Sequence, residues 1–112
     1  MSPNRSDASA TIHSSLACDP QLSELVEQFV AEMPSRVAWL QRNYDSGDWE
    51  ALRRSAHQLK GAAGSYGFDR LTPHALRLES LLAKGAPLDE VTSAFGELIA
   101  HCRRVTATAR HS

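Results

Sequence analysis

The sequence has little of what several large classes of protein require. Its 112 residues contain no long apolar run, and the first residues lack the basic and apolar regions of a signal peptide. We therefore expect no transmembrane helix, no membrane partner and a cytoplasmic location. The two cysteines, Cys18 and Cys102, are far apart and form no CxxC motif, which favours free thiols over a metal knuckle or a redox site. A net charge of -1 gives no reason to expect nucleic-acid binding.

Catalytic signatures are equally scarce. The sequence has no glycine-rich phosphate loop, so we expect no ATP site and no cofactor. Its five histidines form no HExxH motif, so we expect no metal site. At this length the chain is one domain, too short to carry a nucleotide-binding catalytic domain beside its own core. Any chemistry must therefore be simple or shared with a partner protein.

What the sequence does contain is helical periodicity. Apolar residues make up 42% of the chain and charged residues 22%, which is ordinary for a globular protein. No segment alternates with period two, so we expect no sheet. Residues 1–18 are rich in Ser, Ala, Asn and Thr and predict a short irregular, flexible N-terminal segment, with the folded domain at 19–112.

Four helical segments make up this domain. The first is expected to begin with Asp19 as its N-cap and to reach Tyr44, with Pro34 causing a kink near residue 31 or a break into two abutting helices. The others are expected at about 49–65, 72–84 and 87–108. Amphipathic helices joined by short connections favour an all-α, antiparallel up-and-down four-helix bundle. The expected apolar stripes are Leu22, Leu25, Phe29, Met33, Val37, Leu40 and Tyr44, then Trp49, Leu52, Ala56, Leu59 and Ala63, then Leu76, Leu78, Leu81 and Leu82, and finally Leu88, Val91, Phe95, Leu98, Cys102 and Val105.

The second segment directs His57 away from its apolar stripe. Lys60, Gly61 and Gly64 follow His57 at offsets of 3, 4 and 7, which keeps all four residues on one helical face. A glycine inside a helix costs roughly 1 kcal/mol relative to alanine, so two of them on this face indicate that bare backbone is needed there. A partner protein that approaches the imidazole closely would need it.

The same segment resembles the signature of a known family. The matching residues are the run His57-Gln58-Leu59-Lys60-Gly61, followed by Gly64, Gly67 and Phe68. This run is similar to the signature of histidine-containing phosphotransfer (HPt) domains, the relay modules of two-component signalling, and the resemblance covers about residues 19–110. It implies that His57 is the phosphoacceptor, that Lys60 helps to neutralise the phosphoryl group and that Gly61 leaves room beside the imidazole.

Three charged residues extend this candidate site. Glu79 lies 22 positions after His57, where HPt domains often have glutamine and chemotaxis-type domains have glutamate. A carboxylate there would accept a hydrogen bond from Nδ1–H and leave Nε2 free to attack, whereas the alternative is a plain surface charge. Arg53 and Arg54 flank the same face but are not part of the family motif. They either serve partner docking or belong to a solvated polar face.

Several other residues have ordinary structural explanations. Tyr66 and Phe68 close the end of a helix and are expected to pack there rather than to line a docking surface. Trp39 and Trp49 are expected to be packing residues. We expect His74, which follows a first-turn proline, to be exposed to solvent.

The resemblance implies a relay function for the whole chain. A phosphoryl group would pass through His57 between the receiver aspartates of response regulators, or from a sensor or hybrid histidine kinase to a receiver. The Asp/Asn/Gly pattern of a histidine-kinase ATP lid is missing, so the chain would be a phosphotransfer intermediate without ATP-dependent kinase activity of its own.

The resemblance also bears on the conditions of transfer and on the alternatives. Mg²⁺ would come with the acidic pocket of the receiver, and a monomer is the default for the family. Two alternatives stay open. One is a docking module that binds a receiver or a kinase without transferring phosphate, and the other is a phosphoacceptor domain excised from a larger hybrid or chemotaxis-type kinase.

Overall fold

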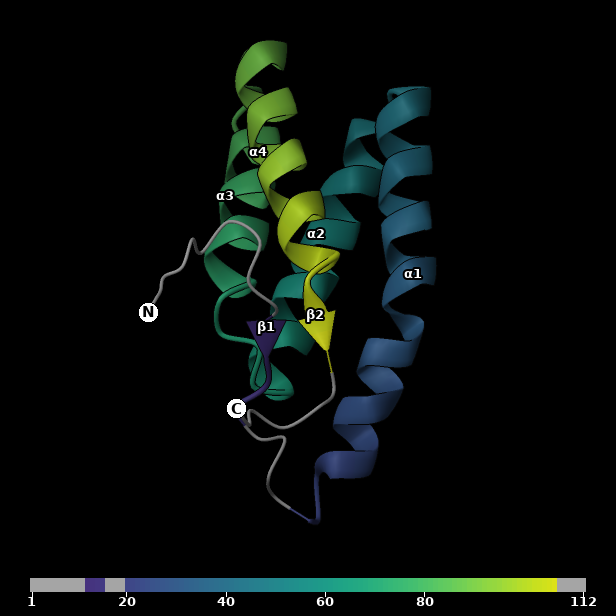
Figure 1. Cartoon of the computed structure of the whole chain (residues 1–112). Helices are drawn as coiled ribbons and strands as arrows, with labels where there is room; N and C mark the ends of the chain where they lie inside the picture. Colours follow the sequence, from purple (N-terminus) through teal and green to yellow (C-terminus); the bar gives the residue numbers. More distant parts are fainter. Residues whose placement is uncertain (1–11, 16–19, 107–112) are drawn as a thin grey trace, which may run out of the picture.

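The computed structural model describes residues 12–15 and 20–106, which form four helices and one short pair of strands. The helices run alternately up and down, and each packs against its neighbours in the sequence (Figure 1). The predicted all-α four-helix bundle is therefore confirmed. Among the described helices, none is both long and apolar enough to cross a membrane. In chain order the elements are β1 (Ile12–His13), α1 (Ser23–Ser46), α2 (Trp49–Ser65), α3 (Thr72–Ala83), α4 (Leu88–Cys102) and β2 (Val105–Thr106).

Helix α1 differs from its prediction at its start. It begins at Ser23, and Leu22 occupies the N-cap position without a side-chain cap, while the predicted cap Asp19 lies outside the described residues. One continuous helix runs through Pro34, so there are not two abutting helices. In Figure 1 the N-terminal part of α1 leans away from the axis of the C-terminal part, as a proline that removes one backbone hydrogen bond predicts.

Helix α2 has the boundaries that its sequence predicts. Gly47 ends α1 with a left-handed φ of 71°, and the Asp48 side chain then accepts a hydrogen bond of 3.1 Å from the backbone N–H of Ala51. Gly67, with a φ of 81°, turns the chain after α2. Both glycines adopt backbone angles that other residues avoid, so these turns fix where α2 starts and stops.

The core lies along one stripe of each helix. In α2 the stripe is buried as predicted, except that Trp49 is 40% exposed at the first turn. In α1 Val26 faces the core instead of Leu25, and in α3 Ala75 does so instead of Leu76. In both cases a larger apolar residue lies next to the residue that faces the core. A prediction from hydrophobicity therefore assigns the buried position to the larger neighbour. The exposed large apolar side chains are Leu25, Trp39, Trp49, Leu76 and Leu88.

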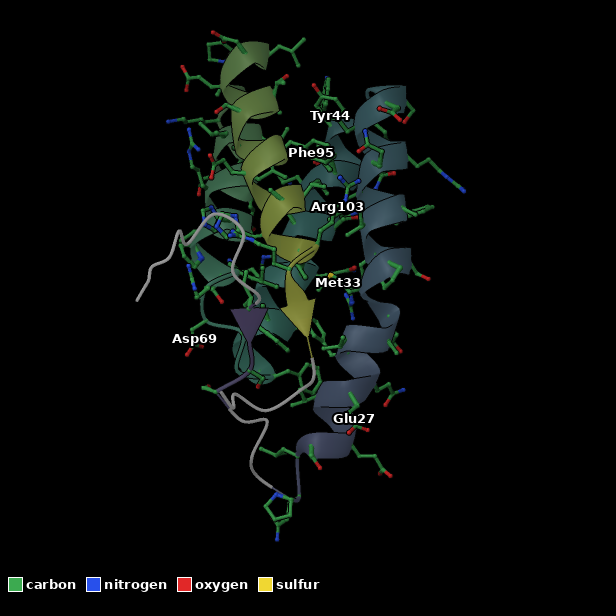
Figure 2. All side chains as sticks on the ribbon, viewed as in Figure 1. Glu27, Met33, Tyr44, Asp69, Phe95 and Arg103 are labelled. Carbon is green, nitrogen blue, oxygen red and sulfur yellow. The ribbon has the colours of Figure 1, made fainter. Side chains whose placement is uncertain are left out.

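Aromatic packing closes the bundle between its first and last helices. Tyr44 of α1 stacks on Phe95 of α4 with ring centroids 4.3 Å apart, and both are labelled near the upper end of the molecule in Figure 2. The Tyr44 hydroxyl also hydrogen-bonds to Thr92 of α4 at 2.7 Å. Just after the C-terminal end of α2, Phe68 is fully buried and stacks on Phe29, and Tyr66 packs on the same Phe29 ring. The expectation that Tyr66 and Phe68 are packing residues is therefore confirmed.

Residues 12–15 of the N-terminal segment are hydrogen-bonded to the rest of the domain. Strand β1 pairs with β2 in parallel, the Ile12 N–H donates to the Arg104 carbonyl at 2.6 Å, and the Ile12 side chain is buried. The Ser15 N–H donates to the Gly67 carbonyl at 2.8 Å. The prediction of no strand pairing is therefore wrong, because two-residue strands are too short to show a period. The same pairing ends α4 at Cys102 rather than at residue 108.

We expect Ile12→Ala to lower the free energy of unfolding by about 2 to 4 kcal/mol, because it removes a buried side chain and leaves a cavity between β1 and the bundle. Urea denaturation measures the change. The matched control is Leu25→Ala, at an exposed position of α1, which should stay within about 0.5 kcal/mol of wild type. Equal effects of the two substitutions would show that the N-terminal segment does not contribute to the core.

Candidate functional site

The outer face of α2 presents His57 to solvent. Its side chain is 62% exposed, whereas Ala56 and Leu59 beside it are buried against the rest of the bundle. The helix buries one stripe, so a residue outside that stripe has no apolar surface to cover it. The imidazole is therefore accessible to a second protein without any movement of the core.

Glu79 of α3 contacts both His57 and Lys60 of α2. One carboxylate oxygen, Oε2, lies 2.8 Å from Nδ1 of His57, and the other, Oε1, accepts a hydrogen bond of 2.8 Å from Nζ of Lys60. The predicted contact between Glu79 and His57 is present. Because an ionised carboxylate can only accept, Nδ1 carries the proton of this bond, and Nε2 of the neutral ring keeps its lone pair.

The hydrogen bonds of Glu79 favour the ionised form of its carboxylate. The hydrogen bond from Lys60 lowers the pKa of Glu79 most, and the bond from His57 lowers it further, while partial burial opposes both. Only 16% of the Glu79 side chain is exposed. The site therefore contains an anion at neutral pH, oriented by two donors and partly shielded from water.

The two arginines lie beside His57 but are engaged elsewhere. Arg53 forms a two-pronged contact with Glu50, at 2.6 and 3.1 Å, and Arg54 lies 3.5 Å from the same carboxylate. This contact raises the pKa of Arg53 and lowers the pKa of Glu50. Sequence reasoning missed Glu50, although its spacing of three and four residues to the arginines is the spacing of helical ion pairs.

A surface hollow joins these groups around the imidazole. It is lined by Arg53, Arg54, His57, Gln58 and Glu79. The sequence does not identify Gln58 as a site residue, because a polar side chain next to the histidine is ordinary on an exposed helix face.

The two glycines of this face have no neighbour that requires them. Gly61 and Gly64 are exposed, and a Cβ atom added at either position would meet nothing within 4 Å. Neither glycine has the left-handed φ found at Gly47, Gly67 and Gly85. The fold itself therefore gives no reason for the missing side chains.

A separate group of metal-ligating residues lies between α3 and α4. His74, Glu97 and His101 each offer one ligand atom, and these three atoms lie within 4.8 Å of one another. His74 is half-buried and stacks on His101, so the prediction that it is an exposed residue is wrong. Burial first, and then the neighbouring His101, lowers the pKa of His74, so its ring is neutral at physiological pH. Sequence spacing shows no such group, because His74 comes from a different helix.

Fold and site together define the class of protein: a small helical bundle that exposes a histidine backed by a carboxylate. The Hpt domain family model matches residues 24–108, more than half of the chain. The chain therefore belongs to the Hpt domain family, whose members act in histidine phosphotransfer in two-component signalling and interact with response-regulator receivers and histidine kinases. Comparison with curated proteins and with solved structures gives no match.

The Glu79 carboxylate should make the free energy of unfolding fall at low pH, and Glu79→Gln should remove this contribution. Because the folded pKa lies below the ordinary value of 4.5, the unfolded chain binds the proton more readily. The stabilisation is fully present above the unfolded pKa and is lost as pH falls through the lowered folded pKa. We expect wild type to lose more stability than Glu79→Gln between about pH 6 and about pH 3, measured by urea unfolding at each pH.

The matched control for this comparison is Glu90→Gln, at an exposed glutamate of α4. This variant should keep the wild-type dependence on pH, since it leaves the bonds of Glu79 to Lys60 and His57 intact. Parallel profiles for wild type and Glu79→Gln would contradict the charged, doubly bonded state of the carboxylate.

Proposed function

We propose that this chain is a phosphotransfer intermediate in which Nε2 of His57 accepts and donates a phosphoryl group. The observation that carries the proposal is the hydrogen bond of 2.8 Å between Nδ1 of His57 and the Glu79 carboxylate. The His57 side chain is nevertheless 62% exposed. The bond fixes the ring so that its nucleophilic nitrogen faces outward. Membership in the Hpt domain family supports this role for an exposed histidine.

The transfer step uses this arrangement directly. Nε2 attacks the phosphorus of an aspartyl phosphate on a receiver, an N–P bond forms, and the P–O bond to the aspartate breaks with its electron pair on the leaving carboxylate. The ring gains positive charge while Nδ1 keeps its proton, and the Glu79 carboxylate stabilises that charge. The reverse sequence returns the phosphoryl group, because the N–P bond of a phosphoimidazole remains reactive.

Lys60 supplies a positive charge to the product. Its ammonium group has three N–H donors, one of which is bound by Oε1 of Glu79. A phosphoryl group adds about -1.5 to -2 charges beside His57 and offers acceptor oxygens to the remaining donors. Since the Lys60 side chain is anchored but partly exposed, it can neutralise part of this charge without leaving Glu79.

The partner that fits this face is the receiver domain of a response regulator, with a sensor or hybrid histidine kinase as the alternative source of phosphate. Gly61 and Gly64 leave open backbone beside the imidazole, which allows an acidic receiver pocket to approach. Arg53 and Arg54 add positive charge at its rim, although Glu50 engages them in the free protein. Mg²⁺ for the transfer would reside in the receiver, and the chain would act as a monomer without its own ATP-dependent kinase activity.

The first test replaces His57 with glutamine, which is uncharged and cannot act as the nucleophile. Wild type incubated with a phosphorylated receiver or with a small phosphoramidate donor should gain one acid-labile phosphoryl group, detected by intact mass spectrometry. His57→Gln should gain none. Its helical content, measured by circular dichroism, should match wild type because the side chain is exposed.

A phosphoryl group that appears equally on His57→Gln would place the acceptor elsewhere. A folded wild-type protein that gains no phosphoryl group from several competent donors, yet binds a receiver, would favour the docking module instead. In that case the face around His57 would be a binding epitope rather than a transfer site.

The open backbone next to His57 gives a second test. Gly61→Gln should leave the fold intact, because the added side chain meets no atom of this chain, and should slow transfer at least tenfold by filling the approach path. The control Gly61→Ala should raise the free energy of unfolding by about 1 kcal/mol through its higher helix propensity. Transfer is followed by the decay of the phosphorylated receiver. An unchanged rate in Gly61→Gln would remove the argument from the glycine face.

A further inference from the structure

A second group of chemistry-bearing side chains lies away from the face of His57. His74 belongs to α3, and Glu97 and His101 lie four residues apart on α4, so that both project from one side of that helix toward α3. His74 and Glu79 are five positions apart on α3, which separates them by about 140° around the helix. The two groups therefore occupy different faces of the bundle.

The imidazoles of this group meet closely. The rings of His74 and His101 stack with centroids 3.8 Å apart. Nδ1 of His101 lies 2.6 Å from the backbone carbonyl oxygen of Glu97, and a carbonyl can only accept, so Nδ1 carries the proton. In this tautomer of the neutral ring, the free lone pair is on Nε2 of His101. A backbone carbonyl that binds one ring nitrogen while the other nitrogen faces a metal is a common arrangement of metal-ligating histidines.

The spacing of the three groups is close to that of a metal site. Their ligand atoms lie within 4.8 Å of one another, whereas bonds of about 2.0–2.2 Å in tetrahedral geometry need separations of roughly 3.5 Å. Closing the difference takes a movement of about 1 Å, which is within the reach of side-chain rotation in the exposed Glu97 and the partly buried histidines.

We propose that His74, Glu97 and His101 bind a Zn²⁺ ion, with water as the fourth ligand. Zn²⁺ accepts both imidazole nitrogen and carboxylate oxygen, whereas the two imidazoles disfavour Mg²⁺ or Ca²⁺, which prefer oxygen ligands. Because the ligands come from both α3 and α4, the ion ties these helices together and stabilises the bundle. The site is independent of phosphate transfer by His57.

Positive charges around the group limit how tightly it binds. Arg70 and Arg104 line the surface hollow that also contains Glu97 and His101, and Arg77 lies near enough to influence His74 electrostatically. Glu97 is the acidic member of the group and offsets part of this charge. The site therefore depends strongly on the carboxylate, which makes Glu97 the most informative position to change.

The test uses the whole chain without an affinity tag, in a buffer free of phosphate. Equilibrium dialysis against buffered free Zn²⁺ should give one bound ion per chain, and Co²⁺ in its place should show the visible absorption of a tetrahedral ion. Excess Zn²⁺ should raise the melting temperature of wild type by roughly 5 to 10 °C. His101→Asn and Glu97→Gln should each weaken binding at least tenfold.

Two matched controls separate this site from the rest of the chain. Glu90→Gln changes another exposed glutamate of α4, and His57→Asn removes the exposed histidine of α2; both should bind Zn²⁺ as wild type does. Glu97 is exposed, so its variant should fold even where a histidine variant does not. No saturable binding by wild type, binding that Glu97→Gln leaves unchanged, or binding that His57→Asn abolishes would each overturn the proposal.

Discussion

Close packing of α2 on α3 is the constraint on which the site depends. Ala56 and Ala63 of α2 and Ala75 of α3 are all fully buried, so both helices contribute small side chains to the core. Small side chains let the two helix axes approach, which brings Glu79 within hydrogen-bond distance of both His57 and Lys60.

Two acidic residues bind the basic side chains of the site. Glu79 binds His57 and Lys60, and Glu50 engages Arg53 and Arg54 one turn away. The arginine pairs are exposed ion pairs, which are worth little and exchange readily for a better partner. In the proposed transfer, a phosphoryl group or an acidic receiver pocket would recruit the arginines, while the partly shielded Glu79 holds the histidine in place.

The helices and most of the core follow from local sequence. Period and capping residues predict the bounds of α2 and the bundle class. Errors in the predicted buried stripes fall at Leu25, Leu76 and Leu88, which are exposed, whereas the neighbouring Val26 and Ala75 are buried. The prediction that Trp49 belongs to the buried stripe is wrong, because this residue lies in the first turn of α2, where it is 40% exposed. The pairing of β1 with β2 could not be predicted, because it joins short segments from the two ends of the chain.

For the site, the sequence by itself determined which residues share the outer face of α2, because helical spacing alone aligns His57 with Lys60, Gly61 and Gly64. Only the tertiary structure decided which groups from other helices complete it. The hydrogen bonds of Glu79 to His57 and Lys60 depend on how α3 is rotated against α2. The contact of His74 with His101 likewise depends on the packing of α3 on α4. Such contacts are set by the rotation and separation of packed helices, which no local pattern records.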